Sequence, residues 1–117
     1  MKVLIVDDEE KFVSALAERL VIRGIEADWA TTYSEALSKA ETKRYDVAVL
    51  DVKMPGMSGI ELRRRLESVD PHLRFILVTG HGSEEDYDIG RRESCFYILK
   101  PFKIETLLEK LEQAVNR

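Results

Sequence analysis

Short apolar runs alternate along this chain with longer segments in which apolar residues recur every three or four positions. The first run, residues 3–6, is apolar throughout, which is typical of a strand buried on both faces. Comparable runs predict further strands at residues 25–30, 47–50, 75–78 and 95–99.

The longer segments have the period of amphipathic helices. Thr32 with Glu35, and Ser58 with Glu61, have the capping-box spacing that marks a helix start, and Gly24 stands where a first helix would end. Residues 83–93 form the weakest candidate helix, because their apolar positions are sparse. The predicted core-facing stripes are Phe12, Ala15, Leu16 and Leu20; Tyr33, Ala36, Leu37 and Ala40; Leu62, Leu66 and Val69; and Ile104, Leu107, Leu108, Leu111 and Val115.

Five strand–helix units in strict alternation predict an α/β fold, a doubly wound parallel sheet with helices on both faces. The 117 residues are enough for one domain, so residues 1–117 are expected to form a single unit. Ligands of such sheets bind at the carboxyl ends of the strands. The residues at those ends are therefore the candidates for function.

Polar residues stand at four of the five strand ends. Asp7 and Asp8 follow the first strand, Asp51 the third, Thr79 the fourth and Lys100 the fifth. Three carboxylates at one edge repel one another, and a hard divalent cation such as Mg²⁺ or Mn²⁺ removes that repulsion. A carboxylate beside the metal can attack phosphorus, and a lysine and a hydroxyl can then neutralise the phosphoryl oxygens. Taken singly, the acid pair could be a helix cap, the threonine a turn residue and the lysine a solvated side chain.

Composition narrows the function classes. A net charge of −4 argues against direct binding to nucleic acid, which needs a basic surface. No run approaches the roughly 20 apolar residues that span a bilayer, so no membrane association is expected. The single cysteine, Cys95, cannot form an internal disulfide, which fits a cytoplasmic location.

The strand-end residues lie in motifs that resemble the receiver domains of bacterial two-component response regulators, and the resemblance covers the whole chain. It implies a flavodoxin-like (βα)5 fold with strand order 2-1-3-4-5. The matching stretches are Val6-Asp7-Asp8-Glu9, Leu50-Asp51-Val52-Lys53-Met54-Pro55-Gly56-Met57-Ser58-Gly59, Val78-Thr79-Gly80 and Lys100-Pro101-Phe102.

The resemblance implies that Asp51 accepts a phosphoryl group from a sensor histidine kinase or a histidine phosphotransfer protein. Mg²⁺ would be held directly by Asp8, Asp51 and the Lys53 carbonyl, with Asp7 acting through water. Thr79 and Lys100 would hold phosphoryl oxygens. The protein would then be no enzyme in the usual sense, but a phosphoacceptor with autophosphorylation and autodephosphorylation chemistry of its own.

Further expectations concern the response to phosphorylation. Tyr97 occupies the position of the family's switch aromatic, and the Lys100–Pro101 peptide is expected to be cis. The face formed by the fourth helix, fifth strand and fifth helix would control a C-terminal effector domain, a partner protein or a phosphorylation-dependent dimer. Lys53 and His81 are expected at the mouth of the site, where they would obstruct hydrolytic water.

Three other functions were weighed against this one. A phosphate-independent interaction module with the same fold is the main alternative, but it would lack the acid pair, Asp51 or Lys100. An aspartate-nucleophile phosphohydrolase needs an Asp-x-Asp motif after the first strand, and Asp7-Asp8-Glu9 does not match it. A flavin-binding domain needs a phosphate-binding loop there, and two aspartates would repel the phosphate.

The Glu93-Ser94 pair departs from the small Gly-Ala pair that many members of the family have before the fifth strand, so the resemblance does not fix the shape of the output face.

Overall fold

The computed structural model describes residues 1–80 and 96–116. The predicted helix at residues 83–93, His81 and Cys95 lie outside the described residues. The elements are β1 (Lys2–Val6), α1 (Glu10–Ile22), β2 (Glu26–Ala30), α2 (Tyr33–Thr42), β3 (Val47–Asp51), α3 (Gly59–Val69), β4 (Arg74–Gly80), β5 (Phe96–Lys100) and α5 (Ile104–Val115).

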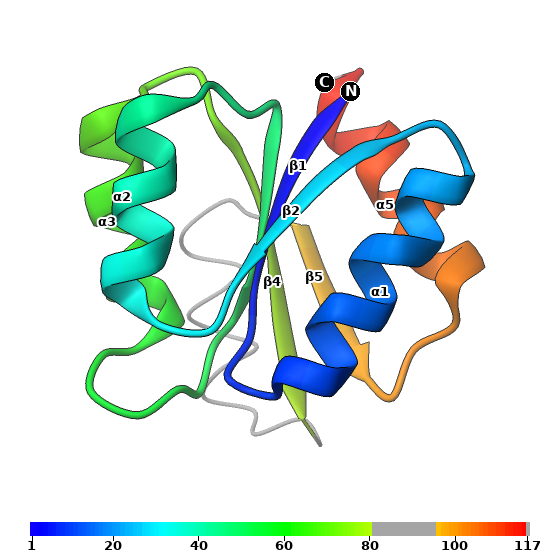
Figure 1. Cartoon of the computed structure of the whole chain (residues 1–117), viewed down its shortest axis with the longest axis horizontal. Helices are drawn as coiled ribbons and strands as arrows, with labels where there is room; N and C mark the ends of the chain where they lie inside the picture. The colour runs from blue at the N-terminus through cyan, green and yellow to red at the C-terminus, as the bar shows by residue number, and fades with distance from the viewer. Residues whose placement is uncertain (81–95, 117) are drawn as a thin grey trace.

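The strands form one parallel sheet in the order β2-β1-β3-β4-β5, as predicted. Helices α1 and α5 cover one face of the sheet, and α2 and α3 cover the other (Figure 1). Every strand therefore ends at the same edge, which Figure 1 shows at the bottom.

Alternate residues of each central strand enter two separate cores. In β1, Val3 and Ile5 pack toward α1 and α5, whereas Leu4 and Val6 pack toward α2 and α3. This is the period of two that any strand imposes on its side chains, and it explains why the central strands are apolar throughout. The all-buried pattern of β3 confirms the interpretation of its sequence as a strand covered on both faces.

The helix boundaries follow the local signals. The Thr32 hydroxyl accepts a hydrogen bond from the Glu35 backbone at 3.2 Å, and the Ser58 hydroxyl accepts one from the Glu61 backbone at 3.1 Å. Gly24, with φ of +83°, follows α1, which is the left-handed conformation that favours glycine. The two predicted helix starts at Thr32 and Ser58 and this glycine stop are thus confirmed.

The core-facing stripe of α1 differs from the predicted one. Phe12 is 36% exposed and Ala15 is exposed, whereas Val13 and Ala17 are buried beside Leu16. Consecutive residues lie about 100° apart around a helix, so Phe12 falls on the flank of the buried strip centred near Val13 and Ala17. The small side chain of Ala17 lets the helix approach the sheet closely, a contribution that a count of large apolar residues misses.

The predicted core-facing stripes of α3 and α5 also extend one residue too far. Val115 of α5 is 38% exposed while the neighbouring Ala114 is fully buried, and Val69 at the end of α3 is 40% exposed. The remaining predicted positions of these stripes are buried or half-buried.

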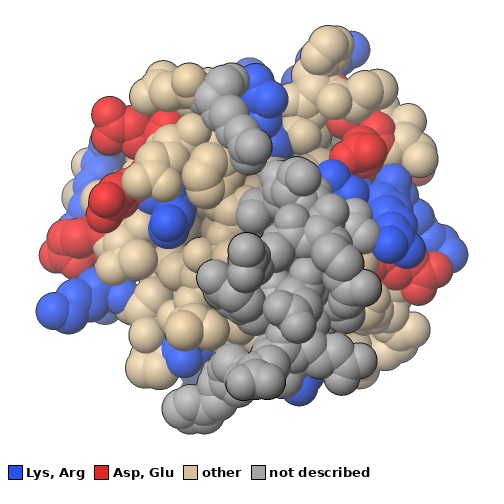
Figure 2. All heavy atoms as spheres, turned by 180° about the vertical axis from the view of Figure 1, so that it is seen from behind, with Lys and Arg blue, Asp and Glu red and all other residues tan. Residues whose placement is uncertain are grey.

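The surface carries charges of both signs. On the face that Figure 2 shows, Lys and Arg side chains stand beside Asp and Glu around the rim of the molecule, with no broad patch of one sign among the coloured residues. None of the helices within the described residues has the length and apolar character needed to cross a bilayer.

One glycine controls how closely α3 approaches the end of β3. A Cβ atom on Gly59 would lie 2.5 Å from the Asp51 carbonyl oxygen and 2.7 Å from the Val52 Cα. Both neighbours are backbone atoms, so they cannot rotate away. Gly59 therefore allows the first turn of α3 to lie against the peptide that carries Asp51.

Replacing Gly59 with alanine is expected to destabilise the fold by about 1–3 kcal/mol, the usual cost of overpacking a tight contact. Urea denaturation followed by circular dichroism measures this. Gly80→Ala is the matched control, because no heavy atom of the described residues lies within 4 Å of the position its Cβ would take. Equal stability of the two variants would contradict the close-approach argument.

Candidate functional site

The sheet brings the predicted strand-end residues together. Asp51 ends β3 and pairs in register with Val78, so Thr79 lies one residue further along the neighbouring β4. Lys100 ends β5 beside Gly80. The exposed fractions of Asp7, Asp51 and Thr79 are 3%, 8% and 0%. Four polar groups thus meet at one edge with little access to water.

Asp7, Asp8 and Asp51 form an acidic cluster. Carboxylate oxygens of these three residues lie within 4.8 Å of one another. Asp7 and Asp51 are buried, whereas Asp8 is exposed. Carboxylate oxygens at this spacing fit a hard divalent cation such as Mg²⁺ or Ca²⁺. These metals prefer oxygen ligands to nitrogen or sulfur ligands. The donor set is therefore suited to the metal that the sequence predicts.

Lys100 supplies positive charge to this cluster. Its Nζ lies 2.5 Å from Asp7 Oδ2, 3.4 Å from Asp51 Oδ2 and 3.6 Å from Glu9 Oε1. Burial lowers the pKa of the ammonium, but the hydrogen bond to Asp7 and the charges of Asp51, Asp7 and Glu9 together outweigh burial and raise the pKa. Lys100 is consequently a permanent cation at neutral pH.

In Asp51, by contrast, the effect of burial on the pKa outweighs the effect of the nearby charges and hydrogen bonds. Burial raises the pKa of its carboxyl above the ordinary value, and the Asp7 charge adds to this effect. The Lys53 backbone N–H, which donates to Asp51 Oδ1 at 3.1 Å, and the Lys100 ammonium offset only part of it. Asp51 is thus a poorly solvated carboxylate whose environment disfavours its charge when no metal is bound.

Asp7 and Asp8 differ in how they are engaged. Asp7 Oδ1 accepts a hydrogen bond from the Glu9 backbone at 2.9 Å, and Oδ2 accepts the one from Lys100. Asp7 therefore also helps to start α1, although the N-cap position itself is Glu9, whose side chain makes no capping bond. The exposed Asp8 is more accessible to an incoming cation than the buried Asp7.

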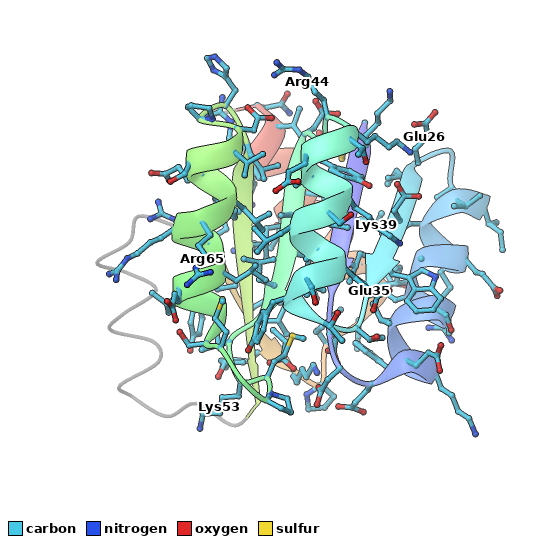
Figure 3. All side chains as sticks on the ribbon, turned by 60° about the vertical axis from the view of Figure 1, so that its left-hand side comes forward. Glu26, Glu35, Lys39, Arg44, Lys53 and Arg65 are labelled. Carbon is cyan, nitrogen blue, oxygen red and sulfur yellow. The ribbon has the colours of Figure 1, made fainter. Side chains whose placement is uncertain are left out.

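The remaining predicted residues lie around this cluster. Thr79 is buried and its hydroxyl is 3.4 Å from the Gly80 carbonyl oxygen. Tyr97 is half-buried, and its ring packs against the α2–α3 side of the core. The Lys100–Pro101 peptide is cis, as predicted. Lys53 is exposed, and Figure 3 shows its side chain projecting outward at the end of the molecule where the strands end.

Two aromatic residues near the site were not predicted as part of it. Lys100 Nζ lies 4.9 Å from the centre of the Phe12 ring, and that ring packs edge-on against Phe102 with 6.1 Å between centroids. Phe12 was assigned to the core of α1, so only its position at the first turn, just after the acid pair, could have suggested this contact.

A third residue, Tyr33, reaches the loop that follows Asp51. Its hydroxyl donates a hydrogen bond to the Met54 carbonyl oxygen at 2.9 Å. The sequence assigned Tyr33 to the core-facing stripe of α2, and its ring does pack against that core. The apolar period of the helix gave no sign of the contact made by its hydroxyl.

This chain is similar to known proteins in sequence and in fold. A family model described as the response regulator receiver domain matches residues 3–112. A transcriptional regulatory protein of Bacillus subtilis, YkoG, is 36% identical over 98% of this chain. A CheY-like receiver domain protein from Methanospirillum hungatei superposes with a TM-score of 0.90 at 32% identity, covering 98% of this chain and 93% of that one.

A third similarity bears on chemistry. A response regulator protein from Burkholderia pseudomallei, whose structure contains a phosphorylated aspartic acid, a calcium ion and citrate, superposes with a TM-score of 0.87 at 27% identity. The match covers 98% of this chain and 68% of that one. The chain spans about half the length of YkoG, since the match covers 51% of that protein.

Replacing Asp51 with asparagine is expected to stabilise the metal-free protein at pH 7, because the substitution removes a carboxylate whose pKa is raised by burial. A raised folded-state pKa means that ionisation opposes folding above that pKa. The gain should therefore shrink as the pH falls through the raised folded-state pKa, and it should vanish below the ordinary value of 3.8, where the carboxyl is mostly protonated in both states. Urea denaturation in EDTA at pH 7 and at low pH measures the difference.

Asp46→Asn is the control for that experiment, since it removes an exposed carboxylate before β3, at the opposite end of that strand from Asp51. A loss of stability in Asp51→Asn at pH 7, or a gain that does not change with pH, would refute the balance described for Asp51.

Proposed function

The chain belongs to the family of response regulator receiver domains, and we propose on that basis that Asp51 is its phosphoacceptor. The donor would be the phosphohistidine of a sensor histidine kinase or of a histidine phosphotransfer protein. One observation carries the proposal: a buried aspartate ends β3 within 4.8 Å of two further carboxylates and 3.4 Å from the Lys100 ammonium. A cap or a turn needs none of this arrangement.

The reaction that this arrangement supports is a direct phosphoryl transfer. An Asp51 carboxylate oxygen forms a bond to phosphorus as the bond between phosphorus and the histidine nitrogen breaks, and the imidazole nitrogen keeps the electron pair of that bond. The product is an acyl phosphate on Asp51. Asp51 gains negative charge in this step, so nearby cations decide whether it proceeds.

Lys100 and Thr79 are the residues placed to meet that charge. Lys100 already lies beside Asp51 as a cation, and it would exchange part of its contact with Asp7 for a phosphoryl oxygen. The Thr79 hydroxyl lies one residue beyond the partner of Asp51 on β4, from where it would donate a hydrogen bond to another phosphoryl oxygen.

The acidic cluster would hold the divalent cation, with Asp8, Asp51 and the Lys53 carbonyl as direct ligands and Asp7 through water. When bound, Mg²⁺ neutralises charge on the transferring phosphoryl group and relieves repulsion among the three carboxylates. Asp8 would give the cation its access, because its side chain faces solvent.

The response to phosphorylation would pass through Thr79 and Tyr97. Movement of Thr79 toward the phosphoryl group would leave space beside β4, and the half-buried Tyr97 on the adjacent β5 would fill it. The face formed by the fourth helix, β5 and α5 would then signal to a C-terminal effector domain, a partner or a second copy. YkoG is called a transcriptional regulatory protein, which supports an effector domain that acts on transcription in the cytoplasm.

The lifetime of the acyl phosphate would depend on groups at the mouth of the site. Lys53, exposed two residues after Asp51, would pair with a phosphoryl oxygen and shield it from water. His81 was assigned the same role and lies outside the described residues.

Incubation with acetyl phosphate and Mg²⁺ is expected to add one phosphoryl group, and it should be on Asp51. Mass spectrometry of peptides after borohydride reduction locates the site. Asp51→Asn and addition of EDTA should each abolish the adduct, whereas the control Asp46→Asn should label like the wild type. Undiminished labelling of Asp51→Asn, or full labelling in EDTA, would contradict the assignment, and a wild type that takes up no phosphoryl group would favour a phosphate-independent interaction module.

Millimolar Mg²⁺ is expected to raise the melting temperature of the unphosphorylated protein, because a ligand that binds only the folded state stabilises it by RT ln(1 + c/Kd), where c is the free ligand concentration. At a hundredfold excess over the dissociation constant the gain would be about 2.7 kcal/mol. Differential scanning fluorimetry measures the shift. Asp8→Ala should abolish most of it, and an equal shift in that variant would exclude Asp8 as a ligand.

A further inference from the structure

The loop between β3 and α3 joins the candidate phosphoacceptor to the carbonyl proposed as a metal ligand. Its base is fixed by backbone contacts: Gly59 N–H donates to the Val52 carbonyl oxygen at 2.8 Å, and Lys53 forms a bridge with Ser58. The Lys53 N–H also donates to the Asp51 carboxylate at 3.1 Å. The direction of the Lys53 peptide therefore depends on the course of the loop that follows it.

The tip of that loop lies against Tyr33, the first residue of α2. The hydroxyl donates to the Met54 carbonyl oxygen at 2.9 Å. Gly56 has φ of +91°, and a Cβ there would lie 3.5 Å from the Tyr33 ring. One side chain thus holds a carbonyl of the turn with its hydroxyl, while its ring lies beside the glycine of the same turn.

The position of Tyr33 at the helix start is fixed independently of the loop. The capping box of Thr32 and Glu35 holds the first turn of α2, and the ring packs into the core together with Met54 and Met57. Figure 3 shows Glu35 in this first turn, near the end of the molecule at which Lys53 lies. The first turn of α2 therefore holds the loop by one hydrogen bond and by the packing of the Tyr33 ring.

We propose that Tyr33 is a positioning residue for cation binding: its hydroxyl holds the 54–57 turn so that the neighbouring Lys53 carbonyl and the Asp51 carboxylate are set before the cation arrives. The inference rests on the proposed function, because it assumes that this loop supplies a metal ligand. A site whose supporting contacts are formed in advance loses less conformational entropy on binding. Without the Tyr33 hydroxyl, cation binding would itself have to order the 54–57 turn, and the affinity for the cation would fall.

A purely structural role for Tyr33 makes a different prediction. In that case, loss of the hydroxyl would lower stability and leave the affinity for the cation unchanged. Tyr45 provides the matched control. Its hydroxyl donates to the Asp28 carboxylate at 2.6 Å, and it stands before β3, at the end opposite Asp51. Tyr45→Phe removes the same atom from a buried hydrogen bond that does not touch the loop.

The experiment uses the full chain and Mg²⁺ itself. Isothermal titration calorimetry with MgCl₂ gives the dissociation constant of the wild type, Tyr33→Phe and Tyr45→Phe, and urea denaturation in EDTA gives their stabilities. Tyr33→Phe should weaken Mg²⁺ binding by roughly three- to tenfold, the effect expected from the net loss of one hydrogen bond. Labelling of Asp51 by acetyl phosphate at subsaturating Mg²⁺ should slow by a similar factor. Tyr45→Phe should bind Mg²⁺ like the wild type even if it is less stable.

The outcomes separate the two hypotheses. If the wild type binds Mg²⁺ and labels on Asp51 but Tyr33→Phe has the same affinity, the positioning role is wrong and the proposed function stands. Equal weakening by Tyr33→Phe and Tyr45→Phe would also overturn it, because the effect would then be general destabilisation. A wild type that neither binds Mg²⁺ nor labels would overturn both.

A second variant tests the route through the turn. Gly56→Ala strains the left-handed residue that lies over the ring, so it should also weaken Mg²⁺ binding. If both changes act through one turn, their effects on the dissociation constant will not multiply in the double variant. Effects that multiply independently would contradict a shared route through Tyr33.

Discussion

The burial of Asp51 beside Asp7 and Asp8 is the constraint to which the rest of the site responds. Carboxylates at this spacing repel one another, and Asp51 has lost much of the water that would screen its charge. Lys100 offsets part of the repulsion but lies closer to Asp7 than to Asp51. The site is therefore left with excess negative charge, which a divalent cation can neutralise. An affinity for metal and a cost in stability have the same physical origin here.

The strand order creates this constraint. Placing β1 next to β3 brings the acid pair beside Asp51, although more than forty positions separate them in the chain. Lys100 comes from β5, which β3 and β4 separate from β1, and its long side chain still reaches Asp7. Two apolar cores, one on each face, pack against the sheet whose backbone pairing keeps these ends in register. The polar edge is thus supported by the best-packed part of the molecule.

The residues that contact the site from the two faces of the sheet have different roles. On the α1–α5 side, the Phe12 ring stands beside the Lys100 ammonium, where a cation over an aromatic face is favoured, and Phe102 packs edge-on against that ring. On the α2–α3 side, Gly59 and Tyr33 fix the backbone on either side of the loop that follows Asp51. Side-chain charge is therefore organised from one face and backbone geometry from the other.

The order of the described elements, the parallel sheet, the N-caps Thr32 and Ser58 and the residues at the strand ends could all be predicted from the sequence, because these depend on local period, helix-cap chemistry and motif. The sequence did not determine which flank of α1 is buried, since Ala17 packs as well as a larger residue once the helix lies on the sheet. Nor did it show that Phe12 meets Lys100 or that the Tyr33 hydroxyl meets Met54. Those contacts join residues far apart in the chain, so only the tertiary structure, which fixes the distance between elements, could decide them.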